Sequence, residues 1–339
     1  MTIRMGQIGI GAWGSNVLRA SNAAKRAQVL RACDASQAKV EAMATVYPNI
    51  DFTTDHNSLL TDPDLDAIII ATPAETHFEL GKSALENGKH VFIEKPFVLN
   101  AKDGETLVAL AEEKGLQLMV GHLLLYHPAY QDLKARVQSE DFGDLQYITS
   151  DRANLGTVRT HENVMWSFAP HDIAVVLYLM EEAPAQIKCT GSGFINSKIE
   201  DVCFLDLTFP SGRLAKIHVS WIYPRKIRHM SVVGTKQMIE LDDTQLTDKI
   251  VIHNVGAEKK VADTGFTSRY EYESVTFRRG DTVFPQVPSG EPLRAEMQHF
   301  VDCIADNVEP QSSGRRSLDV IRILEKAEAD LQAHRSAAS

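Results

Sequence analysis

The sequence contains few cysteines, and they are scattered. Among its 339 residues only Cys33, Cys189, Cys203 and Cys303 carry thiols. None of them forms a Cys-x-x-Cys pair or has a histidine at the spacing of a metal ligand. This pattern argues against a zinc site and a disulfide framework. We expect four buried free thiols and no bound metal.

Long apolar runs are also missing. The longest, near residues 175–180, is far shorter than a membrane span and is followed directly by Glu181 and Glu182. The first residues run into strand-like sequence without the basic and apolar regions of a signal peptide. We therefore expect a cytoplasmic protein with no membrane partner.

Positive charge is in deficit, with 35 lysines and arginines against 45 acidic residues and a net charge of −10. This balance argues against nucleic acid as a partner. A small anionic ligand would need a local cluster of arginine and lysine. The length favours two domains rather than a single core.

The first 121 residues alternate apolar runs with helical patterns. Candidate strands are 3–8, 29–34, 67–71, 90–94 and 116–120, and candidate helices are 15–24, 35–46, 77–87 and 101–114. This alternation predicts a parallel sheet covered by helices on both faces, with ligands at the carboxyl ends of its strands. We therefore predict an α/β Rossmann domain over residues 1–121.

The pattern changes after residue 121. We expect helices over 128–139 and from about 171 to 180, and a strand over 145–154 between them. Pro170 suits the first turn of the second helix, which would leave His171 near its N-terminus. Residues 203–209 and 215–221 alternate apolar and polar side chains, as strands with one covered face do. The tail, 296–331, reads as one or two helices broken near Pro310. Residues 122–339 are thus predicted to form an α+β domain with an open, mainly antiparallel or mixed sheet.

A glycine motif follows the first strand. Gly9 permits a tight turn, Gly11 lets the backbone approach a pyrophosphate, and Gly14 lets helix and strand pack closely. Asp34, at the end of the second strand, would accept hydrogen bonds from the adenosine ribose and repel a 2′-phosphate. The motif therefore predicts NAD rather than NADP, the alternative being a glycine turn without a nucleotide.

Two further motifs follow later strands of the same sheet. Thr72-Pro73 comes after the fourth strand and Glu94-Lys95-Pro96 after the fifth, which places both at the predicted cofactor edge. A residue before proline favours extended backbone, which would direct Lys95 over that edge. The alternative is an ordinary surface lysine in a charged turn.

These motifs, with Val120-Gly121-His122 and Pro128, resemble the glucose–fructose oxidoreductase, inositol dehydrogenase and MocA family. The resemblance implies an enzyme that oxidises or reduces a hydroxyl carbon of a sugar or cyclitol, and an open sheet that often forms dimers or tetramers. It also implies that Lys95 lies beside the nicotinamide. The cofactor site is predicted to comprise Gly9, Gly11, Ala12, Trp13, Gly14, Asp34, Thr72, Pro73, His77, Glu94 and Lys95.

The family usually offers an aspartate and, four residues later, a histidine. Here Ser167 holds the first position and His171 the second, and Asp172 follows directly, so Ser167 or Asp172 stands in for the aspartate. A base works best with a pKa near the operating pH, and histidine, at about 6.5, needs less adjustment than lysine, at about 10.4. We expect His171 to be the general base and Lys95 to polarise the hydroxyl. The alternative for His171 is a capping or core histidine.

The region around residues 152–172 resembles the branch of the family that oxidises UDP-linked N-acetyl sugars. The implied reaction oxidises the C3 hydroxyl of UDP-N-acetylglucosamine to a 3-keto sugar, which an aminotransferase would convert for lipid A. Arginine and lysine suit the diphosphate, and Lys226 and Arg228, two apart, would share a strand face. The predicted substrate residues are His122, Tyr126, Arg152, Asn154, Arg159, Asn163, Trp166, Ser167, His171, Lys226 and Arg228.

Several alternatives stay open at this point. The substrate of the same site would be the corresponding uronate if a further cation faced its carboxylate, or another sugar or cyclitol. Independently of the substrate, the alternative for each arginine is an ion-pair partner in an acidic protein, and the alternative for His122 and Tyr126 is hinge packing. A non-enzymatic NAD-sensing module is a further alternative, although it would need neither Lys95 nor His171.

Overall fold

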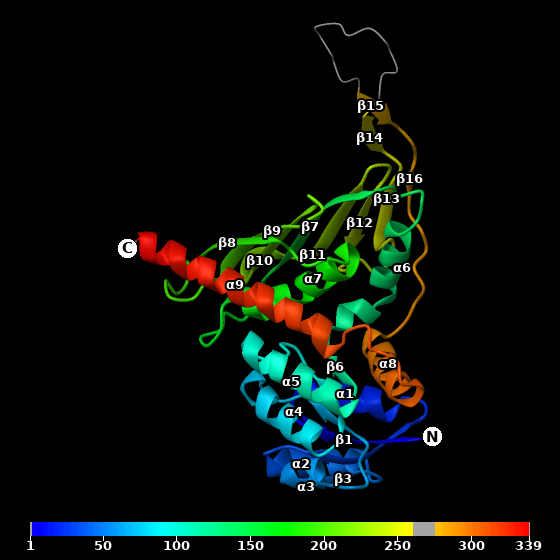
Figure 1. The fold of residues 1–339 in the computed structure, drawn as a ribbon, viewed down its shortest axis with the longest axis vertical. Helices are drawn as coiled ribbons and strands as arrows, with labels where there is room; N and C mark the ends of the chain where they lie inside the picture. The colour runs from blue at the N-terminus through cyan, green and yellow to red at the C-terminus, as the bar shows by residue number, and fades with distance from the viewer. Residues whose placement is uncertain (1, 260–274, 339) are drawn as a thin grey trace, which may run out of the picture. The chain divides into compact units, whose positions relative to one another are not determined.

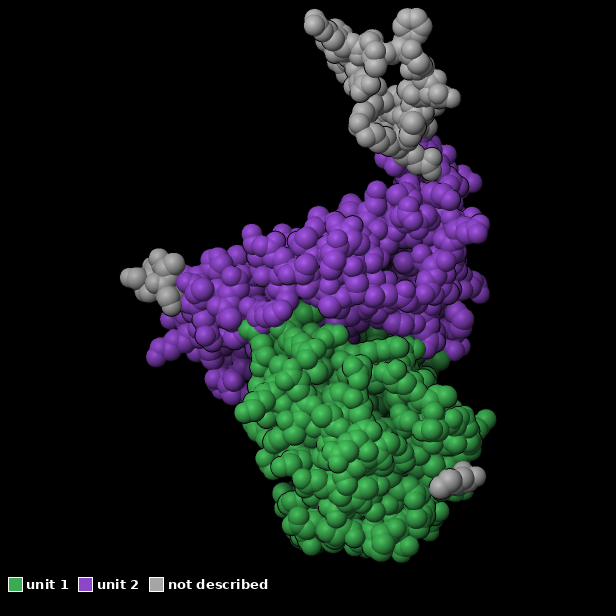
Figure 2. All heavy atoms as spheres, in the orientation of Figure 1, with its two compact units in different colours: residues 1–127, 290–325 green, residues 128–289, 326–339 purple. Residues whose placement is uncertain are grey.

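A computed structural model describes residues 2–259 and 275–338. The chain forms two compact units, which Figure 2 shows in different colours. Unit 1 comprises Met1–His127 with Gly290–Glu325, and unit 2 comprises Pro128–Ser289 with Lys326–Ser339. This division differs from a boundary at residue 121, because a segment near the C-terminus joins the first unit. The physical reason is that helix α8 (Pro292–Asp306) packs against helix α1 (Gly14–Asn22) and strand β1 (Ile3–Ile8).

Unit 1 contains the predicted Rossmann sheet. Its six strands are all parallel and run in the order β3-β2-β1-β4-β5-β6, the order of dinucleotide-binding folds. After β1 come β2 (Ala27–Cys33), β3 (Asp51–Thr53), β4 (Ala67–Ile70), β5 (His90–Ile93) and β6 (Leu118–Val120). All four residues of β4 are fully buried, as an apolar central strand predicts.

The helices of unit 1 follow the strands in alternation (Figure 1). They are α1, α2 (Gln37–Val46), α3 (Asn57–Leu60), α4 (His77–Glu86) and α5 (Ala101–Lys114), with short 3-10 turns η1 (Ala74–Thr76) and η2 (Leu123–Tyr126). Helix α8 joins them from a later part of the chain. Helix α5 begins where the Asn100 side chain accepts a hydrogen bond from the Asp103 amide at 2.9 Å. Helix α9 (Gly314–Ala338) follows a connection that holds Pro310, as predicted.

Unit 2 is built on a mixed eight-stranded sheet of order β16-β13-β12-β11-β7-β10-β9-β8. Only β7 and β10 pair in parallel among its described strands, which confirms the predicted sheet class. The strands are β7 (Leu145–Leu155), β8 (Gln186–Ser192), β9 (Val202–Thr208), β10 (Leu214–Ser220), β11 (Ile222–Gly234), β12 (Met238–Asp242), β13 (Ile250–His253) and β16 (Thr282–Val283). A second small sheet pairs β14 (Gly256–Lys259) with β15 (Val275–Arg278).

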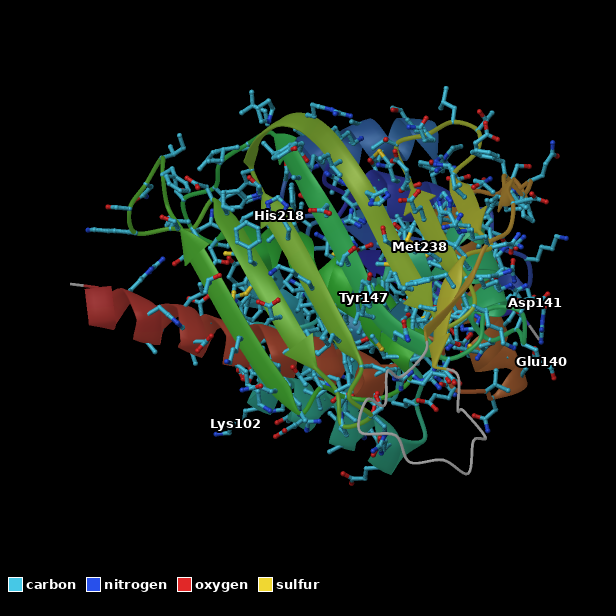
Figure 3. All side chains as sticks on the ribbon, turned by 90° about the horizontal axis from the view of Figure 1, so that it is seen from above. Lys102, Glu140, Asp141, Tyr147, His218 and Met238 are labelled. Atoms are coloured by element: carbon cyan, nitrogen blue, oxygen red, sulfur yellow. The ribbon has the colours of Figure 1, made fainter. Side chains whose placement is uncertain are left out.

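The predicted alternation along β9 and β10 is confirmed. Apolar side chains at every second position, such as Leu205 and Ile217, are fully buried against helix α7 (Val164–Met180). Their neighbours, such as Phe204 and His218, lie on the other face, where their rings stack with centroids 4.7 Å apart. Figure 3 views the sheet from this second face, with Tyr147, His218 and Met238 labelled. The covered face therefore carries the core, and the other face stays open.

Helix α7 corrects one expectation. It begins at Val164 rather than near residue 171, because the Asn163 side chain accepts a hydrogen bond from the Trp166 amide and caps the helix. Pro170 lies inside the helix instead of in its first turn, so one backbone hydrogen bond is lost there. His171 is consequently a mid-helix residue and not a residue of the helix N-terminus.

All four cysteines are free and buried. In residues 2–259 and 275–338, no helix has the length and apolar character needed to span a membrane. No three histidine, cysteine or acidic side chains gather as metal ligands would in the same described ranges. Helix α6 (Pro128–Val137) opens unit 2 close to where it was expected.

Candidate active site

The glycine loop after β1 has the geometry that the motif predicts. Gly9 has φ of +95°, and a Cβ atom there would lie 2.5 Å from the Ala71 carbonyl oxygen. A Cβ at Gly14 would lie 2.3 Å from the Gly9 oxygen, so helix α1 approaches the loop as only glycine allows. The fully buried Gln7 side chain donates to the oxygens of Gly9 and Gly14, at 2.9 and 2.7 Å. The loop is thus a rigid cradle of the kind that holds a pyrophosphate.

Glu94 joins this loop to the predicted catalytic lysine. The Trp13 indole donates to one Glu94 oxygen at 2.6 Å, and the Lys95 amide donates to the other at 3.2 Å. Burial raises the pKa of Glu94, and these donors and the Lys95 charge oppose that rise. Trp13 and Lys95 therefore share one carboxyl group, although they are 82 positions apart in the sequence.

His77 connects the other two motifs. Its ring nitrogens lie 2.9 Å from the Thr72 oxygen and 2.9 Å from the oxygen of Pro96, which follows a cis peptide bond. The ring is buried, and burial lowers the pKa of His77. His77 therefore holds the backbone of the two motif loops together, and Thr72 makes a further hydroxyl contact with Thr76 at 2.6 Å.

Asp34 lies beyond the end of β2, where the adenosine ribose of a bound dinucleotide is recognised. Its two carboxylate oxygens accept the amides of Ile10 and Ser36, each at 3.0 Å, and face the Lys39 ammonium at 3.3 Å. Burial alone would raise the pKa of Asp34, but these hydrogen bonds and the lysine charge lower it. Asp34 is thus an ionised acceptor at neutral pH, as the prediction of NAD requires.

The side chains of His122 and Tyr126 are both buried, but they differ in their hydrogen-bond partners. Tyr126 is buried, and its hydroxyl contacts the Ser312 hydroxyl at 2.8 Å, so it packs inside unit 1 as the hinge-packing alternative proposed. His122 is only 4% exposed, and neither of its ring nitrogens has a hydrogen-bond partner within the described residues. Burial and the nearby Lys95 charge lower the pKa of His122 to about 4. A buried neutral imidazole without a partner is costly unless a ligand supplies one, so His122 keeps its place among the candidate binding residues.

In unit 2, Arg152 is occupied by an internal ion pair. Its Nε lies 2.5 Å from an Asp172 oxygen, and Ser150 donates to the same carboxylate at 2.8 Å. Both charged side chains are buried. Asp172 is therefore the partner of Arg152, and the structure favours the ion-pair alternative for this arginine.

Arg228 lies on the same sheet face, because it pairs with Arg152 across β7 and β11. Its guanidinium donates to the Asn154 side chain at 2.6 Å and to the Ala153 oxygen at 3.0 Å, and it stacks over the Phe168 ring at 5.2 Å. Burial and the Arg152 charge lower the pKa of Arg228. No carboxylate lies within ion-pair distance of Arg228 in the described part of unit 2. A cation so placed has charge left for an anionic ligand.

Helix α7 carries the remaining catalytic candidates. His171 is partly exposed and comes three residues after Phe168, so both lie on one side of the helix. Ser167 is buried and Trp166 is partly buried. Unit 2 therefore places His171 on the side of α7 that carries Phe168, and Arg228 stacks over the Phe168 ring.

Three other predicted substrate residues have structural surroundings of their own. Asn163 caps α7 and donates to Glu328 at 2.8 Å, and Arg159 pairs with its neighbour Glu162. Lys226 is exposed and lies where the pairing of β11 with β7 is interrupted, between Ile222 and Ile227. We expected Lys226 and Arg228 to share one face of a regular strand. That expectation required continuous pairing of β11 with β7, and the pairing is interrupted at Lys226.

Sequence reasoning missed several residues. Gln7 could have been noticed as a polar residue inside an apolar strand. Glu296 is fully buried in α8 with both oxygens unpartnered in the described chain, and burial and Glu94 raise its pKa well above the ordinary value. Its sequence signal is a position within the apolar stripe that includes Leu293 and Phe300. Lys39 and Phe168 belong to no sequence motif that would have marked them as site residues.

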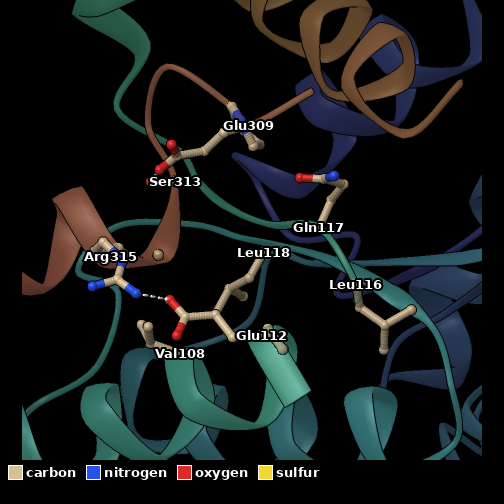
Figure 4. A pocket seen from close by; sticks show the side chains of 11 residues that line it. Val108, Glu112, Leu116, Gln117, Leu118, Glu309, Ser313 and Arg315 are labelled. Carbon is tan, nitrogen blue, oxygen red and sulfur yellow. Dashed lines mark hydrogen bonds and ion pairs between the residues drawn. The ribbon is translucent and has the colours of Figure 1, made fainter. Parts of the chain in front are cut away.

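A separate hollow of about 320 Å³ lies in unit 1 beside the first residues of β6 (Figure 4). Its polar lining is internally satisfied: Arg315 pairs with Glu112 at 2.5 Å and Ser313 donates to Glu309 at 2.7 Å. The glycine loop, Thr72 and Glu94 instead follow the carboxyl ends of their strands. We therefore assign this hollow no part in the candidate site.

Comparison with known proteins agrees with this geometry. Residues 3–122 match the model of the oxidoreductase family with an NAD-binding Rossmann fold, and residues 130–240 match the GFO/IDH/MocA C-terminal domain. A UDP-N-acetylglucosamine 3-dehydrogenase of Acidithiobacillus ferrooxidans is 26% identical over 309 residues, 89% of each chain. A scyllo-inositol 2-dehydrogenase (NAD(+)) of Bacillus subtilis is 24% identical, over 82% of this chain and 78% of its own.

Solved structures show the same fold. That of the Acidithiobacillus ferrooxidans enzyme superposes with a TM-score of 0.82 at 22% identity, over 98% of this chain and 99% of the other. GenD2 from gentamicin A biosynthesis, solved in complex with NAD, superposes with a TM-score of 0.79 at 19% identity, over 97% and 96%. The cofactor is NAD, which the Gly9 cradle and the ionised Asp34 fit. With both domain models matched in sequence, the chain belongs to the glucose–fructose oxidoreductase, inositol dehydrogenase and MocA family of oxidoreductases.

Proposed function

We propose that this chain oxidises the C3 hydroxyl of UDP-N-acetylglucosamine to the 3-keto sugar, with NAD as the oxidant. The observation that carries the proposal is Arg228, a partly buried guanidinium whose hydrogen-bond partners are neutral oxygens. A UDP-sugar brings a diphosphate, which suits such a cation through paired hydrogen bonds. The similarity to a UDP-N-acetylglucosamine 3-dehydrogenase supports the same substrate class.

The reaction removes a proton from a hydroxyl and a hydride from its carbon. The glycine loop and Asp34 would hold NAD, which would supply the hydride acceptor. His171 takes the hydroxyl proton, since an imidazole is a base near neutral pH and this one lies within reach of solvent. Lys95 donates a hydrogen bond to the oxygen that becomes the carbonyl, and its charge stabilises the negative charge that develops there.

Other residues support binding in this proposal. His122 offers a buried, neutral imidazole to the ligand, and Asn154 holds Arg228 in place through its side-chain oxygen. Ser167 takes the position of the usual aspartate, since Asp172 is engaged by Arg152. Trp166 is the candidate for stacking on the sugar or the uracil. Lys226 is the candidate for binding a further anionic group.

The direct test compares two arginines of one segment. Arg228→Ala should raise the KM for UDP-N-acetylglucosamine by about 10–100-fold, because charge-assisted hydrogen bonds are worth about 1.5–3 kcal/mol. The affinity for NAD should stay unchanged. Arg225→Ala, which removes an exposed arginine three residues away, is the matched control and should leave KM unchanged. Equal effects of the two variants would contradict the assignment.

The 3-keto product would be consumed by an aminotransferase, giving a 3-amino sugar for lipid A. Both steps would take place in the cytoplasm. The uronate of the same nucleotide sugar is the alternative substrate, with Lys226 as the cation for its carboxylate. An NAD-sensing role without turnover is the non-enzymatic alternative, and the absence of turnover with every sugar would favour it.

We further propose that the open face of the unit 2 sheet packs against a second copy of the chain, giving a dimer or tetramer. This face exposes large apolar side chains on three neighbouring strands: Tyr147 (43%), Leu214 (51%) and Phe204 (38%). Figure 3 labels Tyr147 on this face. Exposed apolar area of this kind is typical of interfaces. Light scattering should show an oligomer that Phe204→Glu dissociates, and a monomeric wild type would contradict the proposal.

A further inference from the structure

Lys39 occupies a defined place at the ribose end of the NAD site. It lies in the first turn of α2, and its ammonium is 3.3 Å from both carboxylate oxygens of Asp34. The same ammonium would lie 3.8 Å from a Cβ atom at Gly11, in the glycine loop. Its side chain is half exposed (49%), whereas that of Asp34 is only 12% exposed.

This contact changes how Asp34 recognises a nucleotide. Each of its carboxylate oxygens already accepts a hydrogen bond from a backbone amide, one from Ile10 and the other from Ser36. The Lys39 ammonium contacts both of these oxygens, which are the acceptors that ribose hydroxyls would use. It also neutralises the charge by which an aspartate at this position repels a 2′-phosphate.

A second feature favours a phosphate at the same place. Ser36 is the N-cap residue of α2, and its side chain makes no capping hydrogen bond, so the hydroxyl is not used in holding the helix. The helix has ten residues, and its N-terminus attracts negative charge. A lysine, a serine hydroxyl and a helix N-terminus together form a polar, cationic surround.

We propose that Lys39 determines cofactor specificity by admitting a 2′-phosphate, so that the chain binds NADP as well as NAD. In this account the Lys39 ammonium swings from Asp34 to the 2′-phosphate when NADP binds, and Ser36 donates its hydroxyl to the same group. When NAD binds, Lys39 moves aside and the ribose hydroxyls take its place on Asp34. The inference concerns the cofactor alone and does not depend on the identity of the sugar.

The test uses nucleotides without nicotinamide, so that only the ribose end is measured. Binding of ADP and of 2′,5′-ADP to the ligand-free full chain would be followed by calorimetry. In Lys39→Ala the ratio of the dissociation constant of 2′,5′-ADP to that of ADP should rise about five- to tenfold, since one cation near a phosphate is worth roughly 1 kcal/mol. Lys39→Arg should keep the wild-type ratio. Lys82→Ala, which removes a lysine of similar exposure on α4, is the matched control.

A merely structural lysine would give another pattern. Loss of a stabilising ion pair would weaken both nucleotides equally and lower the melting temperature, leaving the ratio unchanged. The proposal requires ADP to bind Lys39→Ala as tightly as wild type or more tightly, because Asp34 is then uncovered. A ratio within twofold of wild type in Lys39→Ala would overturn it.

Discussion

Replacing Asp172 by asparagine should destabilise unit 2 strongly. The side chains of Arg152 and Asp172 are 9% and 4% exposed and lie 2.5 Å apart at their closest atoms. Ser150 donates to the same carboxylate. The substitution leaves the Arg152 charge buried without its counter-ion, and breaking a buried pair in this way costs about 3–5 kcal/mol.

The expected size of the effect is measurable. At roughly 2–4 °C of melting temperature per kcal/mol for a domain of this size, Asp172→Asn should melt about 6–20 °C below wild type. Differential scanning calorimetry of the full chain is the assay. Removing both charges, in Arg152→Met with Asp172→Leu, should recover most of the loss, because the penalty comes from the unpaired charge.

The control is an exposed pair on the same sheet. Lys216 and Asp206 lie 3.3 Å apart with more than half of each side chain exposed, so Asp206→Asn should cost less than about 1 kcal/mol. Equal stability of Asp172→Asn and wild type would refute the assignment of Arg152 to an internal pair. It would then return Arg152 to the candidate substrate cations.

Three further predictions concern unit 1 and the catalytic base. Burial raises the pKa of Glu296 in the folded protein above its value of about 4.5 in the unfolded chain. The protonated Glu296 therefore stabilises the fold fully below about pH 4.5, and this stabilisation is lost as the pH rises through the folded-state pKa. Glu296→Gln should therefore melt above wild type by a margin that grows from pH 5 to pH 8, and a margin independent of pH would count against the buried acid. His171→Ala should lower kcat by about 10²–10⁴-fold and leave NAD affinity, measured by calorimetry, unchanged; unaltered turnover would remove it as the base. Asp34→Ala should weaken NAD binding about tenfold, since it removes the charged acceptor for the two ribose hydroxyls of the cofactor. Unaltered NAD affinity would refute the role of Asp34.

Much of unit 1 could be predicted from the sequence. Its elements alternate with short connections, and Gly9 and Gly14 of the motif have local steric requirements that the structure shows. Glu94 and Trp13 were both recognised, but their hydrogen bond could not be foreseen because it joins loops that only the sheet order brings together. The segment after residue 290 was misplaced for the same reason: its helical pattern says nothing about which unit it packs on.

In unit 2, period-two alternation correctly predicted the buried face of β9 and β10. The same approach failed at α7, where Pro170 was interpreted as a helix start although Asn163 already caps the helix. Charge alone could not separate Arg152 from Arg228. The two arginines are opposite each other on neighbouring strands, and the sequence does not show that the carboxylate of Asp172 in α7 forms an ion pair with Arg152.

The most direct measurement of the proposed function is NADH formation by the purified chain with NAD and a panel of possible substrates. The panel comprises UDP-N-acetylglucosamine, its uronate, UDP-glucose and myo-inositol, with an aminotransferase and glutamate present to remove the ketone. We predict turnover with UDP-N-acetylglucosamine that Arg228→Ala impairs and Arg225→Ala does not. Turnover with myo-inositol alone, at a rate that Arg228→Ala leaves unchanged, would contradict the proposed function.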